Sequence, residues 1–336
     1  MEYLRRNPVK LVAQLTVLFL FLATSAIAQT CVTSEEMDAA TKSALTSTAQ
    51  RYFGMVGQGD LASLRQNAAA GLAANFGGIE AAVTENKTNL AGVTPSPRPP
   101  YLLKLEGTAP IERAEFLCGV FGPNGQTATS SVFIIPNLPP ANYAVTVVDA
   151  ATAKGPYTVS FVLQQEGTAW KFAGFYVKAV QAAGHDGQWF ATRAREFKTK
   201  GQPRNAWLYS AQARELLVPV PFMSTMATDK LYDEFQSVKP ADFPPADIAA
   251  ASKTFKVNSL FLLPLNNEKN EIDLILKYAS ADVSNSGQTF QDNQAVIKAV
   301  VAKYPEFRDA FDSVVARAVE PSGRDFGSML PMKEIK

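Results

Sequence analysis

The chain has 336 residues, of which 47% are apolar and 10% aromatic, enough to bury one large core or two ordinary ones. Its formal net charge at pH 7 is only +1, and its Lys and Arg residues form no dense cluster. Because nucleic acids and anionic membrane surfaces are bound by concentrated basic side chains, the composition argues against both kinds of partner.

The N-terminus has the pattern of an export signal. A basic segment at 5–10 precedes the apolar stretch 11–23, and small residues at 26–28 match what a signal peptidase recognises. The alternative is a retained membrane anchor, but the apolar stretch is shorter than the roughly 20 residues that span a bilayer. We predict a signal peptide over 1–28, so that the mature chain begins near Gln29 and has no transmembrane segment.

The chain contains two cysteines, Cys31 and Cys118. In the oxidising compartment that export implies, they are candidates for one disulfide, and the alternative is two free thiols. A lipid anchor on Cys31 is a further alternative, although Gln29 and Thr30 stand where such a site favours small residues. The expected location is therefore periplasmic or secreted.

Helical spacing characterises the first part of the mature chain. Thr33 and Glu36 have the spacing of a capping box before a helix that runs to a glycine-rich break. Asp60 is predicted to cap a second, short helix, and a third is expected over 79–89. The Pro-rich segment 94–100 then favours an extended connector.

Five runs rich in β-branched and aromatic residues follow the connector, separated by turn sequences. Helices followed by antiparallel strands predict an α+β fold, since a parallel sheet would alternate the two. The predicted strands are AEFLCGVF, SSVFIIPNL, YAVTVVDA, YTVSFVLQQEG and AWKFAGFYVKAV.

Two segments, ALTSTAQRYFGMVGQGDLASLRQ and VSFVLQQEGTAWKFAGFYVK, resemble the nuclear-transport-factor-2-like superfamily over residues 35–180. The resemblance implies N-terminal helices held inside a curved antiparallel sheet that forms a cone. The cavity of that cone often takes an apolar ligand, and some enzymes of the superfamily place a carboxylate there. The Pro-rich insert at 94–100 departs from the usual pattern.

Four aromatic residues of the closing hairpin are the candidate ligand-binding residues of such a cone. Trp170 and Phe172 alternate along one strand and are expected to share a face. The alternative is that these rings simply fill the cone as its core. The candidates are Trp170, Phe172, Phe175 and Tyr176.

The rest of the chain predicts two further parts. After a cone-like domain over 29–183, helical spacing returns at 184–239, and residues 186–220 resemble one tetratricopeptide-type helical hairpin. Two strands, a helix with Asp292 as its expected cap, and a closing strand then predict a small ββαβ unit over 246–336.

Motifs typical of metal centres and nucleotide chemistry are missing from the sequence. His185 is the sole histidine, and the two cysteines are too far apart for a CxxC pair. No P-loop, G-x-S-x-G or dinucleotide-binding motif is found. We therefore predict no catalytic residue, no metal site and no cofactor.

The titratable side chains have structural interpretations that compete with catalytic ones. His185 and Asp186 lie between two glycines, which favours a solvated turn over a catalytic pair. Asp60 could serve as an acid in the cone, but its place before a helix favours an N-cap. The other acidic candidates are expected to be surface charges: Glu112, Glu115, Asp309 and Asp312.

Three functional classes stay open. The first, which we prefer, is a non-catalytic binding or interaction module of the bacterial envelope, whose partner is an apolar small molecule or an envelope protein. The second is a cofactor-free isomerase, dehydratase or hydrolase that uses a carboxylate in the cone. The third is a structural or assembly factor of the envelope.

Overall fold

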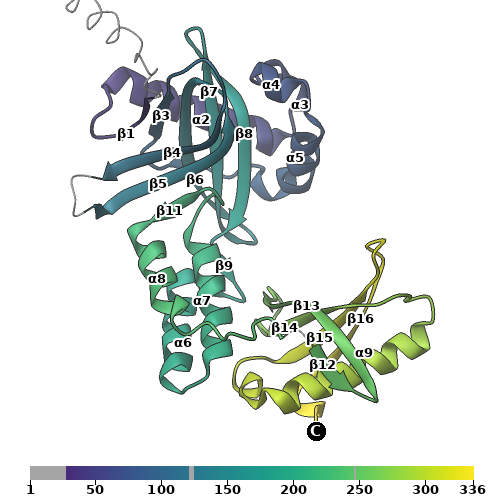
Figure 1. The fold of residues 1–336 in the computed structure, drawn as a ribbon. Coiled ribbons are helices and arrows are strands. Elements are labelled where there is room, and N and C mark those ends of the chain that lie inside the picture. The colour runs from purple at the N-terminus through teal and green to yellow at the C-terminus, as the bar shows by residue number, and fades with distance from the viewer. Residues whose placement is uncertain (1–27, 121–124, 246) are drawn as a thin grey trace, which may run out of the picture.

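The computed structural model describes residues 28–120, 125–245 and 247–336, and the predicted export signal lies outside them except for Ala28. Figure 1 shows three parts in chain order: a sheet with the N-terminal helices, a bundle of helices, and a C-terminal sheet with one long helix. The predicted α+β class is confirmed.

The first long helix, α2 (Ala39–Gln58), begins later than the capping-box prediction placed it. Asp38 is its N-cap and accepts a hydrogen bond from the Thr41 backbone N–H at 2.8 Å. Thr33 and Glu36 do bond to each other at 2.8 Å, but they form a turn ahead of the helix. The prediction was wrong because a second capping residue lies just downstream.

Three shorter helices follow and complete the helical part of the N-terminal region. The predicted cap at Asp60 is present, since its carboxylate accepts from the Ser63 backbone N–H at 3.0 Å. The helices are α3 (Leu61–Gln66), α4 (Ala70–Ala73) and α5 (Gly77–Leu90).

These helices pack against an antiparallel sheet with strand order β1-β3-β6-β7-β8. The Pro-rich connector contributes the two-residue strand β2 (Ser96–Pro97), which pairs with the edge of β6. Buried side chains of α2 contact the apolar face of the sheet. The strands are β1 (Gln29–Val32), β3 (Tyr101–Leu105), β6 (Ala141–Thr152), β7 (Gly155–Glu166) and β8 (Ala169–Ala179).

Two of the predicted strands leave this sheet. β4 (Ile111–Val120) pairs with β5 (Gln126–Leu138), and β5 also pairs with the short β11 (Met223–Thr225), so the three strands form a separate sheet. A second core lies between the two sheets. The disulfide predicted as one alternative is present, with the Cα atoms of Cys31 and Cys118 at 5.1 Å, so it joins β1 to β4.

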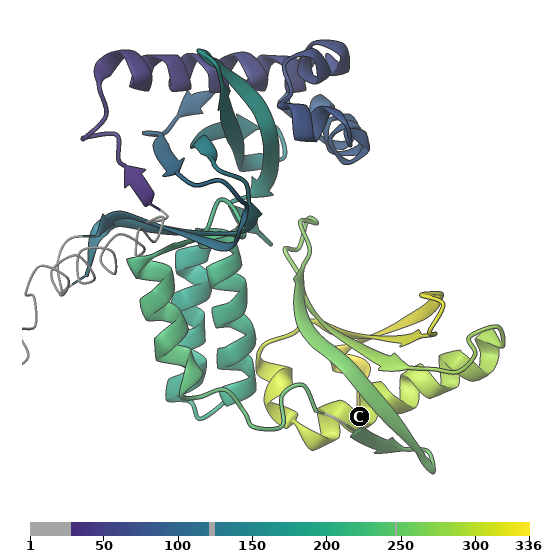
Figure 2. The same ribbon diagram turned by 45° about the horizontal axis from the view of Figure 1, so that its top comes forward.

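The next part is a bundle of α6 (Gly187–Thr199), α7 (Pro203–Leu217) and α8 (Met226–Gln236). Figure 2 shows the three helices side by side below the N-terminal sheets. The sequence predicts only the first two of these helices. α8 begins with a capping box between Thr225 and Thr228, directly after β11.

The C-terminal part contains the predicted ββαβ order as β13, β14, α9 and β15, flanked by β12 and β16. β14 and β15 are parallel and α9 makes the crossover between them. Asn285 caps α9, so the prediction of Asp292 as its cap was wrong by about two turns. The elements are β12 (Asp247–Ala250), β13 (Lys253–Pro264), β14 (Ile272–Ala279), α9 (Ser286–Lys303), β15 (Ser313–Val319) and β16 (Asp325–Pro331).

The two faces of this C-terminal sheet differ. Leu274 and Leu276 of β14 point to the face that α9 covers and belong to its core. Side chains between them point to the opposite face, because successive residues of a strand alternate. On that face the strand register places four apolar residues in one row: Phe261, Ile275, Val315 and Met329.

The bundle and the C-terminal sheet share one continuous core. The 3₁₀ helix η1 (Pro305–Asp309) connects them, since Asn205 Nδ2 donates to the Glu306 carbonyl at 2.6 Å. The Tyr209 hydroxyl donates to the Ala310 carbonyl at 2.7 Å. Burial of Tyr209 raises the pKa of its hydroxyl, so this donor stays protonated at physiological pH.

Candidate functional site

The interior proposed for a cone is occupied by aromatic side chains. The Phe172 ring is fully buried, with its centroid 5.3 Å from that of Tyr52 and 5.9 Å from that of Phe175. Phe161 completes this cluster at 6.3 Å from both phenylalanines. These rings are core residues, as in the alternative that the sequence left open.

A β-bulge separates the four aromatic candidates of β8. Trp170 and Phe172 share the inner face as expected, and the extra residue Ala173 brings Phe175 to that face as well. Tyr176 therefore points to the opposite side, where its ring centroid is 5.4 Å from that of Phe222. Of the four, only Trp170 combines partial exposure with a place on the core face.

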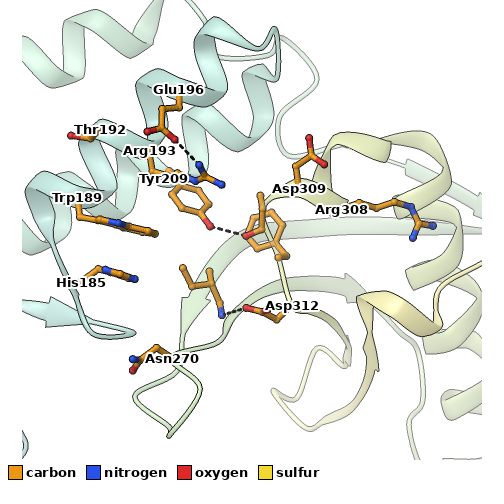
Figure 3. Close-up of a pocket in the computed structure, with 13 residues that line it drawn as sticks. His185, Trp189, Thr192, Arg193, Glu196, Tyr209, Asn270, Arg308, Asp309 and Asp312 are labelled. Carbon is orange, nitrogen blue, oxygen red and sulfur yellow. Dashed lines mark hydrogen bonds and ion pairs between the residues drawn. The ribbon is translucent and has the colours of Figure 1, made fainter.

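A pocket of about 450 Å³ lies where the helical bundle meets the C-terminal part. Figure 3 shows its two walls, one from α6 and α7 and one from the segments around Asn270 and Asp312. We call this the junction pocket. Its lining consists of His185, Trp189, Thr192, Arg193, Glu196, Tyr209, Asn270, Ile272, Arg308, Asp309, Ala310, Phe311 and Asp312.

A stacked pair of rings forms the bundle side of the junction pocket. The ring centroids of His185 and Trp189 are 3.6 Å apart, with an interplanar angle of 5°. Figure 3 shows the two rings lying parallel, with Tyr209 beside them. His185 is held in the short hairpin of β9 (Gln181–Ala182) and β10 (His185–Asp186).

Asp186 does not pair with its neighbour His185. Its carboxylate accepts from the Trp189 backbone N–H at 2.8 Å and so caps α6. This cap fixes the first turn of the helix and thereby the position of the indole. The sequence favours a turn here over a His–Asp pair, and Asp186 is a helix cap as well as part of that turn.

The two glycines that flank these residues permit close approaches. Gly184 has a positive φ of 70°, and a Cβ there would lie 2.8 Å from the amide nitrogen of Asn270. A Cβ at Gly187 would lie 2.7 Å from the Leu217 side chain. Gly184 therefore lets the β9–β10 hairpin approach Asn270 closely, and Gly187 lets the start of α6 approach Leu217 at the end of α7.

The opposite wall is held by hydrogen bonds over long sequence distances. Asp312 accepts from the Ile272 backbone N–H at 2.7 Å, and Asp309 accepts from Gln202 Nε2 at 2.5 Å. The Ala183 backbone N–H donates to the Asn266 side chain at 2.8 Å. Asp309 and Asp312 are exposed, as predicted.

Several polar groups in the junction pocket remain available. Among the described residues, the side chains of His185, Thr192 and Asn270 have no hydrogen bond to another protein group. At the rim, Arg193 and Glu196 form an ion pair at 2.5 Å. A ligand can therefore find an imidazole, a hydroxyl and an amide beside an aromatic wall.

The carboxylates considered for acid–base chemistry have other roles. Hydrogen bonds from Ser63 hold the pKa of Asp60 below its usual value, as expected for a cap. Glu115 is exposed and lies 3.6 Å from Arg113 in an ion pair, and Glu112 is exposed on the same strand. Neither the cap nor these surface residues is the desolvated acid that proton abstraction requires.

One buried carboxyl was missed by the sequence analysis. Asp273 of β14 is 5% exposed, and burial raises its pKa. A signal was available, because an acid here interrupts the apolar strand EIDLILKYAS. It lies beside Ile272 of the junction pocket but on the face of the sheet opposite α9.

Within residues 28–120, 125–245 and 247–336, no group of three or more His, Cys, Asp or Glu side chains is arranged to hold a metal ion. In the same part of the chain, no helix is both long and apolar enough to cross a membrane.

The chain matches no protein-family model, no curated protein and no solved structure.

Proposed function

We propose that this chain is an exported, non-catalytic binding module that holds a small polar molecule in the junction pocket. The observation that carries the proposal is that His185, Thr192 and Asn270, whose side chains have no hydrogen bond within the described part of the chain, line one pocket of about 450 Å³. Concave pockets with an aromatic wall and a few polar groups are typical ligand sites. The ligand class differs from the apolar molecule first expected, because aromatic side chains fill the interior of the cone.

Export is supported by two independent features. The first is the order of basic, apolar and small residues over 1–28. The second is the disulfide between Cys31 and Cys118, which suggests an oxidising compartment. The location is accordingly periplasmic or secreted, and a disulfide-bonded Cys31 is not available for a lipid anchor.

The superfamily resemblance belongs to the same proposal. Helices α2 and α5 packed on an antiparallel sheet support a nuclear-transport-factor-2-like origin of the N-terminal region. The separate sheet of β4 and β5 departs from the simple cone that the resemblance implies. The tetratricopeptide-type likeness of α6 and α7 has less support, since α8 is a third helix of the bundle with no repeat partner.

The proposal is tested by thermal unfolding of the mature protein in the presence of amino acids, monosaccharides and nucleosides, each at millimolar concentration. A compound that binds the native state raises the unfolding temperature. We expect at least one class to do so for the wild type, and expect the shift to be lost in the double variant Thr192→Val, Asn270→Leu.

Thr46→Val is the matched control, because the Thr46 hydroxyl bonds only within its own helix, to the Lys42 carbonyl. This variant should respond like the wild type. Native mass spectrometry of the protein purified from its own envelope gives a second measurement. No co-purifying mass and no thermal shift with any class would overturn the proposal.

A further inference from the structure

A second pocket lies at the rim of the N-terminal sheet, between α2 and the tip of the β7–β8 hairpin. Its volume is about 450 Å³. We call it the rim groove. Its lining includes Ser47, Thr48, Arg51, Asn67, Trp170 and Lys171.

The two sides of the rim groove are fixed to each other. On α2 the lining residues recur three and four positions apart, so they lie on one helix face. The hydroxyl of Tyr52, next to Arg51 in the chain, donates to the Trp170 carbonyl at 3.0 Å. The Trp170 side chain is partly buried against the aromatic core. The indole is therefore held in place at the edge of the groove.

The rim groove carries two positive charges and no negative one. Among the described residues, Arg51 and Lys171 have no carboxylate within ion-pair distance, and the lining contains no Asp or Glu. Other arginines of the same region are paired: Arg65 with Glu80 at 2.5 Å and Arg98 with Asp149 at 2.7 Å.

The polar neutral groups of the rim groove are already partly used. The Asn67 amide donates to the Ser63 carbonyl at 2.8 Å, and the Ser47 hydroxyl donates to the Ser43 carbonyl. The Arg51 guanidinium lies 4.9 Å from the centre of the Tyr52 ring and, within the described residues, pairs with no carboxylate. The chemistry of the groove is thus set by two cations and one indole.

We infer that the rim groove binds an organic anion, a carboxylate or phosphate ester whose apolar body packs on Trp170. Arg51 and Lys171 supply charge-assisted hydrogen bonds to the anionic group. The indole supplies a large, rigid apolar surface for the attached ring or chain. This site is separate from the junction pocket and does not depend on the function proposed for it.

The test is a titration of the mature protein at low ionic strength with phenyl phosphate, followed by tryptophan fluorescence and calorimetry. Benzyl alcohol is the neutral control ligand. We expect phenyl phosphate to bind and benzyl alcohol to bind at least tenfold more weakly. Arg51→Gln and Lys171→Gln should each weaken binding by roughly tenfold, the effect of one charge-assisted hydrogen bond.

Lys42→Gln is the matched control variant, because Lys42 is an exposed cation of α2 outside the rim groove. It should bind phenyl phosphate like the wild type. Trp170→Leu should remove the fluorescence response, which separates this site from Trp189 and Trp207. Circular dichroism checks that each variant is folded.

A parallel arm uses vesicles of phosphatidylcholine with and without one-fifth phosphatidylglycerol, because an anionic lipid headgroup offers the same chemistry. Binding to anionic vesicles that Arg51→Gln and Lys171→Gln reduce would support the inference with a lipid as the source. The inference is overturned if neither phenyl phosphate nor anionic vesicles bind. Wild-type affinity for phenyl phosphate in both charge variants, or binding of benzyl alcohol as tight as that of phenyl phosphate, would also overturn it.

Discussion

The N-terminal and C-terminal sheets are covered in different ways. In the N-terminal region, helices cover one face of the sheet, the β4–β5 sheet covers part of the other, and a disulfide links the two sheets. In the C-terminal part, α9 covers one face, while the other exposes Phe261 and Met329 by 37% and 54%. Both faces of the first sheet are covered, so its groove lies outside, at the rim. The second leaves a pocket where it meets the bundle.

The largest expected effect is on the closed region. Replacing Cys31 and Cys118 by serine opens a covalent loop with a sequence separation of 87 residues. Loop-closure entropy predicts a loss of about 4 to 5 kcal/mol in unfolding free energy. Urea unfolding of wild type and double variant measures it, with hydrogen exchange reporting each region. If the amide protons of α9 became as easy to exchange as those of the N-terminal region, the two regions would not be stabilised separately.

The aromatic core is the next test of the same comparison. Phe172→Ala should cost about 3 to 5 kcal/mol, because a fully buried ring with three aromatic neighbours leaves a cavity. Tyr176→Ala is the matched change on the other face of β8, where the side chain is 37% exposed. Its cost should be about 1 kcal/mol. Equal costs in chemical denaturation would show that the closed face is not the one described.

The smallest effect concerns the C-terminal sheet and depends on pH. Burial raises the pKa of Asp273 above its usual 3.8, so the folded state binds this proton more tightly than the unfolded state. The carboxyl therefore destabilises the folded state increasingly as the pH rises from about 3.8 toward its raised pKa, and by a constant amount above it. Asp273→Asn should stabilise the protein at neutral pH, on the order of 1 kcal/mol.

That gain should disappear as the pH falls below about 3.8, where Asp273 is protonated in both states. Thermal unfolding between pH 3 and 7 measures the difference. Asp247→Asn, an exposed change at the start of β12, is the control and should have little effect at any pH. A gain for Asp273→Asn that did not vary with pH would mean that charge burial is not its cause.

Most long elements could be predicted from the sequence, because their periodicity is local. β7 and β8 follow from alternation, and α7 from apolar spacing after a proline. The missed strands are short or irregular: β1 has four residues, and β16 contains a glycine and ends at a proline. Their pairing energy comes from neighbours far away in the chain, which local patterns do not contain.

The candidate site could be predicted only in part. His185 was singled out as the sole histidine, and Trp170 as a possible ligand contact of the closing hairpin. The junction pocket, however, brings His185 to Asn270 and Asp312, residues from parts that the sequence separates by more than 80 positions. No pattern of residue spacing in the sequence predicts that these residues lie together in the fold. Nor does the alternation of residues along β8 predict the bulge at Ala173, which places Tyr176 on the face opposite the other three aromatic candidates.

If the chain is exported as proposed, the position of the disulfide has a consequence for the order of events during secretion. An exported chain crosses the membrane from its N-terminus. Cys31 therefore crosses before Cys118, and its thiol stays unpaired until Cys118 has crossed as well. Once β4 has crossed, oxidation can fasten the mature N-terminus to it while the bundle and the last sheet are still on the other side. Translocation would then deliver one cross-linked region before the rest, and this crossed part could no longer slip back through the channel.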